Sequence, residues 1–226
     1  MIYQEIDGVK FKMGRQFDFD FLKKYGKVFK VYDDQDSGNI CFGIENKDRK
    51  IFVKFAGAQT AEYNGDVIGA IQRLKATVPI YQSIKQKSLI KYITSEEIGR
   101  GFAMIFEWAD GECMGRMYDT SRKVVAICDI DFFRKSPTVN DMGRMWGSSR
   151  FMSPEEYKYG EKIDEISNVF MIGKMGFSIL TDSDLSFEHY PLSLESFYVL
   201  EKATNPNRCD RHASITDFKK HWLKAL

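Results

Sequence analysis

Two aspartates close an apolar stretch in which carboxylates are unexpected. Asp129 and Asp131 follow the apolar run at residues 124–128, and two phenylalanines come directly after them. A carboxylate at the end of a buried strand offers hard oxygen ligands, which suit Mg²⁺. We therefore predict that Asp131 binds a metal ion. The alternative is an aspartate that only caps a turn.

One lysine stands inside a dense β-type run at residues 50–57. Lys54 is flanked by Val53 and Phe55, so at least one face of this strand is expected to be buried. An ammonium group on such a strand can direct a positive charge at phosphate groups. The alternative is a strand lysine that faces solvent.

The first half of the chain predicts strands with a single helix. Polar and apolar residues alternate in the first two strands, and turn-forming clusters separate the first three, which indicates an antiparallel meander. Pro79 is expected to kink or end the helix. The expected elements are strands at 25–34, 39–45 and 50–57, a helix at 60–84, and two strands within 88–108.

The second half is predicted to be mainly helical. The first of its helices is apolar on nearly every face beyond Ile166 and is therefore expected to be buried. The three helices are expected at 161–180, 191–204 and 214–226. Strands followed by helices indicate an α+β chain with two lobes. We place a β-rich lobe at residues 1–108 and a mainly helical lobe at residues 109–226.

Composition excludes several classes of protein. The 226 residues are 43% hydrophobic, which suits one large domain or two modest lobes. The 33 basic and 32 acidic residues nearly cancel, which argues against nucleic-acid or membrane-surface binding. No apolar stretch approaches the roughly 20 residues that cross a bilayer, and no secretory signal is evident. The four cysteines form no CxxC pair, so their spacing predicts no zinc site, and we expect a reducing, cytoplasmic compartment.

The order of these elements and motifs resembles a protein kinase of the bacterial serine/threonine type. The resemblance covers roughly residues 25–226 and depends on the ordered set rather than on any one motif. The segments that carry it are SGNICFGIENKDRKIFVKF (37–55, phosphate loop and lysine strand), MIFEWADGE (104–112, hinge), CDIDFF (128–133, metal-binding strand end), GSSRFMSPE (147–155) and NPNRCDRHASITDF (205–218).

This resemblance implies a site for ATP and Mg²⁺ in a cleft between the lobes. Lys54 and Asp131 would be the catalytic residues, with Lys54 on the phosphates and Asp131 on the metal. Gly38 in the phosphate loop, and Glu107 and Ala109 in the hinge, would complete the nucleotide site.

The resemblance also implies a structural ion pair in the second lobe. Glu155 ends the segment at 147–155, and Arg211 in the final motif would be its partner. Such a pair would be buried, and removing either side would leave an uncompensated charge.

Several positions depart from the family pattern. A full phosphate loop has three glycines, but Asp33 and Gln35 stand at two of the places. A carboxylate near phosphates predicts weak nucleotide binding or a loop that points away. The first helix lacks an acid around Thr77 to pair with the lysine, and Asn168 replaces an aspartate that usually holds the catalytic loop.

The catalytic loop is missing from its expected place. The family has a His-Arg-Asp motif before the metal-binding strand, and its aspartate accepts the proton of the substrate hydroxyl. Only residues 113–123 separate the hinge from that strand here, and no such motif occurs in the chain. Either the helix and loop were lost, or the sequence is an abridged kinase, or another acid such as Asp119 acts. The last is least favoured because nothing positions that acid.

Three functions follow from these observations. The first is a serine/threonine kinase-family domain that binds ATP and Mg²⁺ but is inactive as written. The second is a non-enzymatic, pseudokinase-type interaction module, and the third is an unrelated α+β binding protein. The expected partners are a nucleotide and a protein substrate or protein partner. Without the missing helix, residues 166–180 would need a cover: a partner, a second copy in a homodimer, or the omitted residues.

Overall fold

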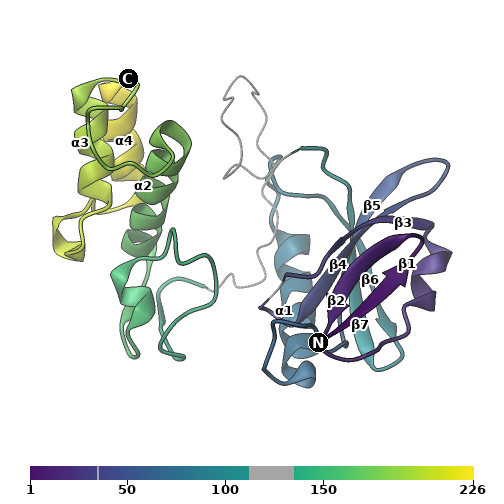
Figure 1. Ribbon diagram of the computed structural model, residues 1–226. Coiled ribbons are helices and arrows are strands. Elements are labelled where there is room, and N and C mark those ends of the chain that lie inside the picture. Colours follow the sequence, from purple (N-terminus) through teal and green to yellow (C-terminus); the bar gives the residue numbers. More distant parts are fainter. Residues whose placement is uncertain (35, 112–134) are drawn as a thin grey trace. The chain divides into compact units, whose positions relative to one another are not determined.

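The computed structural model describes residues 1–34, 36–111 and 135–226 (Figure 1). Within these residues the chain forms two compact units, one at residues 1–111 and the other at residues 135–226. The first contains a β-sheet and one α-helix, and the second is mainly helical. The α+β class predicted from the sequence is confirmed. None of the helices in the described ranges is both long and apolar enough to cross a bilayer.

A five-stranded antiparallel sheet forms the centre of the first unit, in the order β3-β4-β5-β7-β6. The strands are β3 (Lys27–Tyr32), β4 (Asn39–Glu45), β5 (Lys50–Ala56), β6 (Tyr92–Ile98) and β7 (Gly101–Glu107). The predicted meander and the two later strands are confirmed. The turn between β4 and β5 forms because the Asn46 side chain accepts hydrogen bonds from the N–H groups of Asp48 and Arg49.

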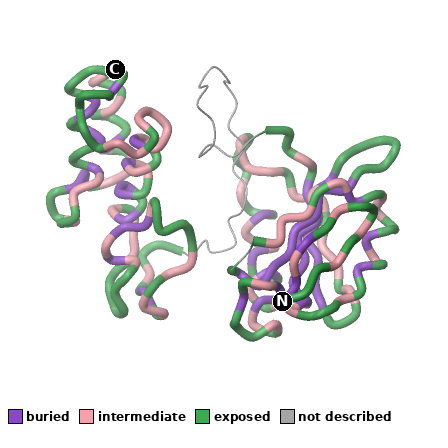
Figure 2. The backbone as a smooth tube through the Cα atoms, in the orientation of Figure 1, coloured by how far each residue is buried: buried purple, intermediate pink, exposed green. Residues whose placement is uncertain are grey.

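Each face of this sheet is covered by a different element. Helix α1 (Val67–Ser83) packs on one face through Leu74 and Tyr81 against Met104 and Phe106. The other face packs against an N-terminal hairpin, β1 (Ile2–Ile6) and β2 (Val9–Met13), and a short 3₁₀ helix η1 (Asp20–Lys24). Figure 2 shows the buried positions concentrated in the sheet between these layers. The alternation of strand side chains thus supplies two apolar cores.

Helix α1 begins later than the sequence pattern suggested, and it continues past its proline. Asp66 is extended, and its carboxylate accepts the N–H groups of Ile68 and Gly69 at 3.1 and 2.9 Å. This N-cap satisfies two of the free donors at the helix start and therefore sets the boundary. The helix extends through Pro79 to Ser83, so the proline does not end it. Packing of the helix on the sheet, before and after the proline, offsets the lost backbone bond.

The second unit is built from three helices, each with a side-chain N-cap. Helices α2 (Glu165–Thr181), α3 (Leu194–Ala203) and α4 (Ile215–Ala225) share a core of Val169, Phe177, Phe197, Leu200 and Phe218. Their caps are Asp164, Ser193 and Ser214. The smaller elements are β8 (Thr138–Val139), which pairs with β9 (Lys162–Ile163), and the 3₁₀ helices η3 (Pro154–Tyr157) and η4 (Arg208–Asp210).

The expectation of a buried helix holds for only one side of α2. Its Val169 and Phe177 are buried against α3 and α4, whereas Met171 and Met175 are each 37% exposed. Two neighbouring helices cover only one side of an α-helix. An apolar sequence therefore does not ensure that every face has something to pack against.

Candidate functional site

Lys54 lies on the central strand β5, and its side chain is buried. Its relative exposure is 3%, and its cross-strand neighbours are Cys41 on β4 and Met104 on β7. Directly paired side chains share one face of a sheet, and Met104 belongs to the core under α1. Lys54 therefore faces α1, not the N-terminal hairpin. The alternative of a strand lysine in solvent is wrong. A lysine side chain is almost never so buried unless its charge is paired with another group.

The part of α1 that faces Lys54 has no acid. Thr77 is buried, and its hydroxyl donates to the carbonyl of Leu74 at 2.7 Å and contacts Met104 Sδ at 3.3 Å. Met104 is the direct neighbour of Lys54, so Thr77 stands close to the place predicted from the sequence for a kinase helix acid. The sequence of α1 contains no aspartate or glutamate. A lysine–helix ion pair cannot form with α1.

The Asp33 carboxylate, at a place where the family has a glycine, is held by the N-terminal hairpin. Its Oδ2 accepts a hydrogen bond from the backbone N–H of Lys12 on β2 at 2.6 Å. The hairpin packs on the sheet face opposite α1, whereas Lys54 lies on the α1 face. Asp33 is therefore directed toward the hairpin, in agreement with the alternative of a loop that points away from the nucleotide.

Gly38 has a packing reason to be glycine. Its φ is +80°, and a Cβ there would lie 2.7 Å from the Tyr63 ring and 2.9 Å from Ala70 Cβ on α1. The same loop is tied to α1 by Arg73, which donates to the carbonyl of Ser37 at 3.1 Å. Both the left-handed backbone and the close approach exclude a side chain. This packing accounts for Gly38 without a nucleotide, which leaves its predicted nucleotide role untested.

The two predicted hinge residues lie at and just after the end of β7, and both are exposed. The Glu107 carboxylate forms an ion pair with Lys91 at 2.5 Å, so its side chain is directed to the neighbouring strand. Trp108 lies with its ring edge to face on Phe29, with centroids 4.9 Å apart. Ala109 follows on the surface. Any contact of Glu107 and Ala109 with a nucleotide would have to come from their backbone groups.

Four of the five predicted site residues therefore belong to the first unit. Lys54 and Glu107 lie on the paired strands β5 and β7, and Gly38 directly precedes β4. The fifth residue, Asp131, lies outside the described residues, as does the segment at 113–123.

The predicted ion pair between Glu155 and Arg211 is confirmed. The two guanidinium nitrogens of Arg211 donate to the two carboxylate oxygens of Glu155 at 2.7 and 3.0 Å, across 56 residues of sequence. Both side chains are buried, at 0% and 5% exposure. Ser167 on α2 adds a third donor to Glu155 at 2.8 Å. The two-point geometry gives this pair both strength and a fixed orientation.

The rest of this network satisfies the guanidinium group. Arg211 also donates to the backbone carbonyls of Asn205 and Pro206 at 2.6 and 3.1 Å, and it lies over the Phe170 ring at 4.7 Å. Burial alone would raise the pKa of Glu155. The hydrogen bonds from Arg211 and Ser167 outweigh that effect, so the pKa lies below its ordinary value.

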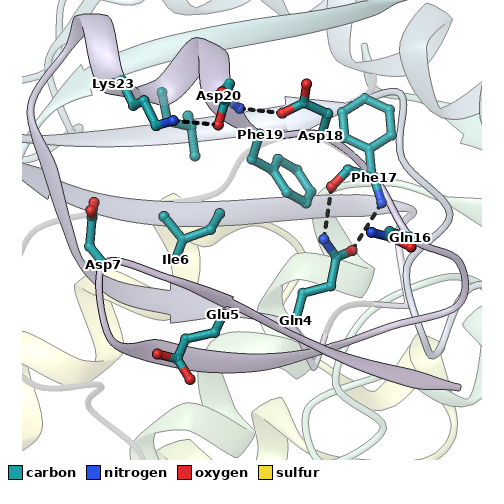
Figure 3. Close-up of a pocket in the computed structure, with 11 residues that line it drawn as sticks. Gln4, Glu5, Ile6, Asp7, Gln16, Phe17, Asp18, Phe19, Asp20 and Lys23 are labelled. Carbon is teal, nitrogen blue, oxygen red and sulfur yellow. Dashed lines mark hydrogen bonds and ion pairs between the residues drawn. The ribbon is translucent and has the colours of Figure 1, made fainter.

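A depression of about 370 Å³ lies beside the N-terminal hairpin, and no sequence pattern indicated it (Figure 3). Its charged lining is Glu5, Asp7, Asp18, Asp20 and Lys23. Gln4 holds the wall by exchanging two hydrogen bonds with the backbone of Phe17, at 2.8 and 3.0 Å, and Lys23 pairs with Asp20 at 2.7 Å. Four carboxylates against one ammonium would repel a phosphate. This depression is therefore no nucleotide site.

A second feature that was not predicted from the sequence is a group of titratable side chains in the helical unit. His212, Asp217 and His221 bring their polar atoms within 4.8 Å of one another. A pattern of histidines and an aspartate around residues 212–221 is visible in the sequence, but only the fold shows that these side chains meet.

Comparison with known proteins does not identify a family for this chain: no family model matches the chain, and no curated protein shows significant similarity to it.

Proposed function

We propose that the chain is a protein kinase-like domain that binds ATP with Mg²⁺ but does not transfer phosphate. The observation that carries this proposal is the buried Lys54. It lies on the third strand of a five-stranded antiparallel sheet and faces α1, the one α-helix described in that unit. A kinase has its phosphate-binding lysine on the third strand of its sheet.

The Glu155–Arg211 pair supports the kinase resemblance independently of Lys54. The order of the motifs predicted this contact across 56 residues, and the structure has it in two-point geometry. A chance juxtaposition of two charges would not be expected to be buried, since unmatched burial of either charge costs several kcal/mol.

The roles follow from chemistry at each position. The Lys54 ammonium would neutralise phosphate oxygens, and the backbone at residues 107–109 would contact the base. Asp131 would hold Mg²⁺, whose charge offsets that of the phosphates. The fit is supported by a buried cation on β5 and by Asp33 being held on the hairpin side.

Phosphoryl transfer is not part of this proposal. No His-Arg-Asp motif occurs in the 226 residues, so the usual acceptor of the substrate proton is missing. Helix α1 also contains no acid to orient Lys54. If the nucleotide does not bind, both absences favour the second candidate, which is a non-enzymatic interaction module of the pseudokinase type.

A thermal-shift titration with ATP and Mg²⁺ tests the nucleotide site. Ligand that binds only the folded state raises the free energy of unfolding by RT ln(1 + [L]/Kd), about 2.7 kcal/mol at a hundredfold excess over Kd. We expect a saturable rise in melting temperature that Lys54→Met abolishes. Lys50→Met, an exposed lysine on the same strand, is the matched control and should retain the shift.

Two outcomes would contradict the proposal. If millimolar ATP leaves the melting temperature of the intact chain unchanged, there is no nucleotide site, and the interaction module becomes the better hypothesis. If Lys54→Met shifts as much as the unmodified chain, nucleotide binds but Lys54 does not hold it.

A further inference from the structure

His212, Asp217 and His221 converge at the start of α4. Asp217 and His221 are four residues apart on α4 and therefore share one helix face. His212 precedes the helix and is buried, with a relative exposure of 1%. Its Nδ1 lies 3.6 Å from Asp217 Oδ2, and His221 Nδ1 lies 3.2 Å from Asp217 Oδ1. The ring centroids of the two histidines are 5.2 Å apart.

The hydrogen bond on the far side of His212 fixes its tautomer. Nε2 lies 3.1 Å from the backbone carbonyl oxygen of Val199 on α3. A carbonyl oxygen only accepts, so Nε2 carries the hydrogen, and in the neutral ring Nδ1 is left with a lone pair. This Nδ1 is buried and has no hydrogen-bond partner among the described residues. A buried acceptor without a partner is costly and calls for an explanation.

The atom that His212 Nδ1 faces is another acceptor. Asp217 Oδ2 is a carboxylate oxygen, and it already accepts the N–H of Ala213 at 3.2 Å. Two lone-pair atoms directed at each other need a positive species between them. The 3.6 Å between these two atoms is too long for a hydrogen bond from a protonated His212 ring.

We propose that His212 Nδ1, the Asp217 carboxylate and a ring nitrogen of His221 bind one divalent transition-metal ion of the zinc type. Imidazole and carboxylate ligands suit such ions, and three protein ligands leave a position for water. Metal–ligand bonds of about 2.0–2.2 Å bring ligand atoms to roughly 3.3 Å from one another. The distances of 3.2 and 3.6 Å are close to that value.

One feature of the surroundings favours metal binding at this site, and two features oppose it. The Val199 carbonyl orients His212 from behind, as partners of metal-bound histidines commonly do. His221 Nδ1 also lies 2.9 Å from the Asp217 backbone oxygen, so its half-exposed ring must release that contact or turn. Lys202 adds an unfavourable positive charge near His212. A bound ion would connect α4 to the turn before it and, through His212, to α3.

Titration of the intact, reduced chain with Zn²⁺, followed by calorimetry, tests this site. We expect one ion per chain, and affinity about tenfold lower or worse in His221→Ala and in Asp217→Asn. His189→Ala is the matched control, because His189 pairs with Asp184 at 3.1 Å on the surface in the same way but has no third ligand among the described residues. Circular dichroism of each variant checks that it is folded.

Cysteine is the competing ligand to exclude. Cys209 is exposed and close in sequence to His212. Co²⁺ in place of Zn²⁺ distinguishes the two: the proposed site should give visible d–d bands without a thiolate charge-transfer band. Undetectable Zn²⁺ binding, binding unchanged in His221→Ala, equal loss in His189→Ala, or loss in Cys209→Ser with retention in His221→Ala would each overturn the proposal.

Discussion

Glu155 and Arg211 show how one pair of residues holds the turn before α4 to the segment before α2. The arginine donates to the carboxylate at two points, and its remaining donors reach the carbonyls of Asn205 and Pro206. Every strong polar group in the pair is therefore satisfied. Such a network is costly to disturb, because each member depends on the others for its hydrogen bonds.

Removing one side of this pair should destabilise the protein strongly. We expect Arg211→Leu to lower the free energy of unfolding by about 3–5 kcal/mol, because Glu155 would remain buried without its counter-charge. Urea denaturation measures this change. The exposed pair of Arg150 and Asp182 is the control, and Arg150→Leu should cost less than about 1 kcal/mol. Equal costs for the two variants would show that burial of the pair does not matter.

The same residue predicts a dependence on pH. The pKa of Glu155 is lower in the folded protein than its ordinary value of 4.5, so the folded state favours the ionised form. Its contribution is complete above pH 4.5 and is lost as pH falls through the lower, folded-state pKa. Urea midpoints measured between about pH 7 and pH 3 should therefore decline below pH 4.5. The decline should be smaller in Glu155→Gln. An identical profile in that variant would assign the acid sensitivity to other carboxylates, such as Asp164, whose pKa is also lowered.

At the scale of elements, α1 depends on a single side chain for its start. Asp66 accepts two N–H groups of the first turn, and no other acid stands in that turn. We expect Asp66→Ala to lower the free energy of unfolding by about 1 kcal/mol, and Asp66→Asn to cost much less, because asparagine caps nearly as well. Chemical denaturation of both variants measures the difference. If alanine and asparagine cost the same, the charge rather than the cap is what stabilises α1.

The strands were predictable from the sequence because their side chains alternate and their turns carry turn-forming residues. The meander of β3, β4 and β5 follows directly from those two signals. The boundary of α1 was not predictable in the same way. The helix was predicted from residue 60, although its apolar period begins at Val67, and the Asp66 cap shows where helical hydrogen bonding begins.

At the scale of the whole molecule, the missing catalytic loop predicts no phosphotransfer. We expect no incorporation of radiolabelled phosphate into a general protein substrate or into the chain itself, with ATP and Mg²⁺ present. The chemical reason is that the sequence has no His-Arg-Asp motif, whose aspartate would accept the proton of the hydroxyl. Turnover that Asp131→Ala abolishes would contradict this prediction, since it would show that another acid does the work of the absent loop.

The candidate site was predictable only in part. Lys54 was chosen because the order of the kinase-like motifs places a lysine on this strand, and the structure buries it on the α1 face. The direction of Asp33 was not predictable, because it depends on a hydrogen bond to Lys12 in a hairpin on the other face of the sheet. Asp131 remains a prediction, since it lies outside the described residues.

The sequence by itself determined the five central strands, the helices and one long-range contact, but not the N-terminal hairpin of β1 and β2. Periodicity and turn residues specify local hydrogen bonding within a few residues, and the ordered motifs paired Glu155 with Arg211. Only the tertiary structure decided which faces are covered and which polar atoms meet. Met171 is exposed because α3 and α4 pack on the other side of α2. His212 presents a lone pair to Asp217 because a carbonyl on α3 takes its only hydrogen. Both depend on neighbours distant in sequence, which no local pattern specifies.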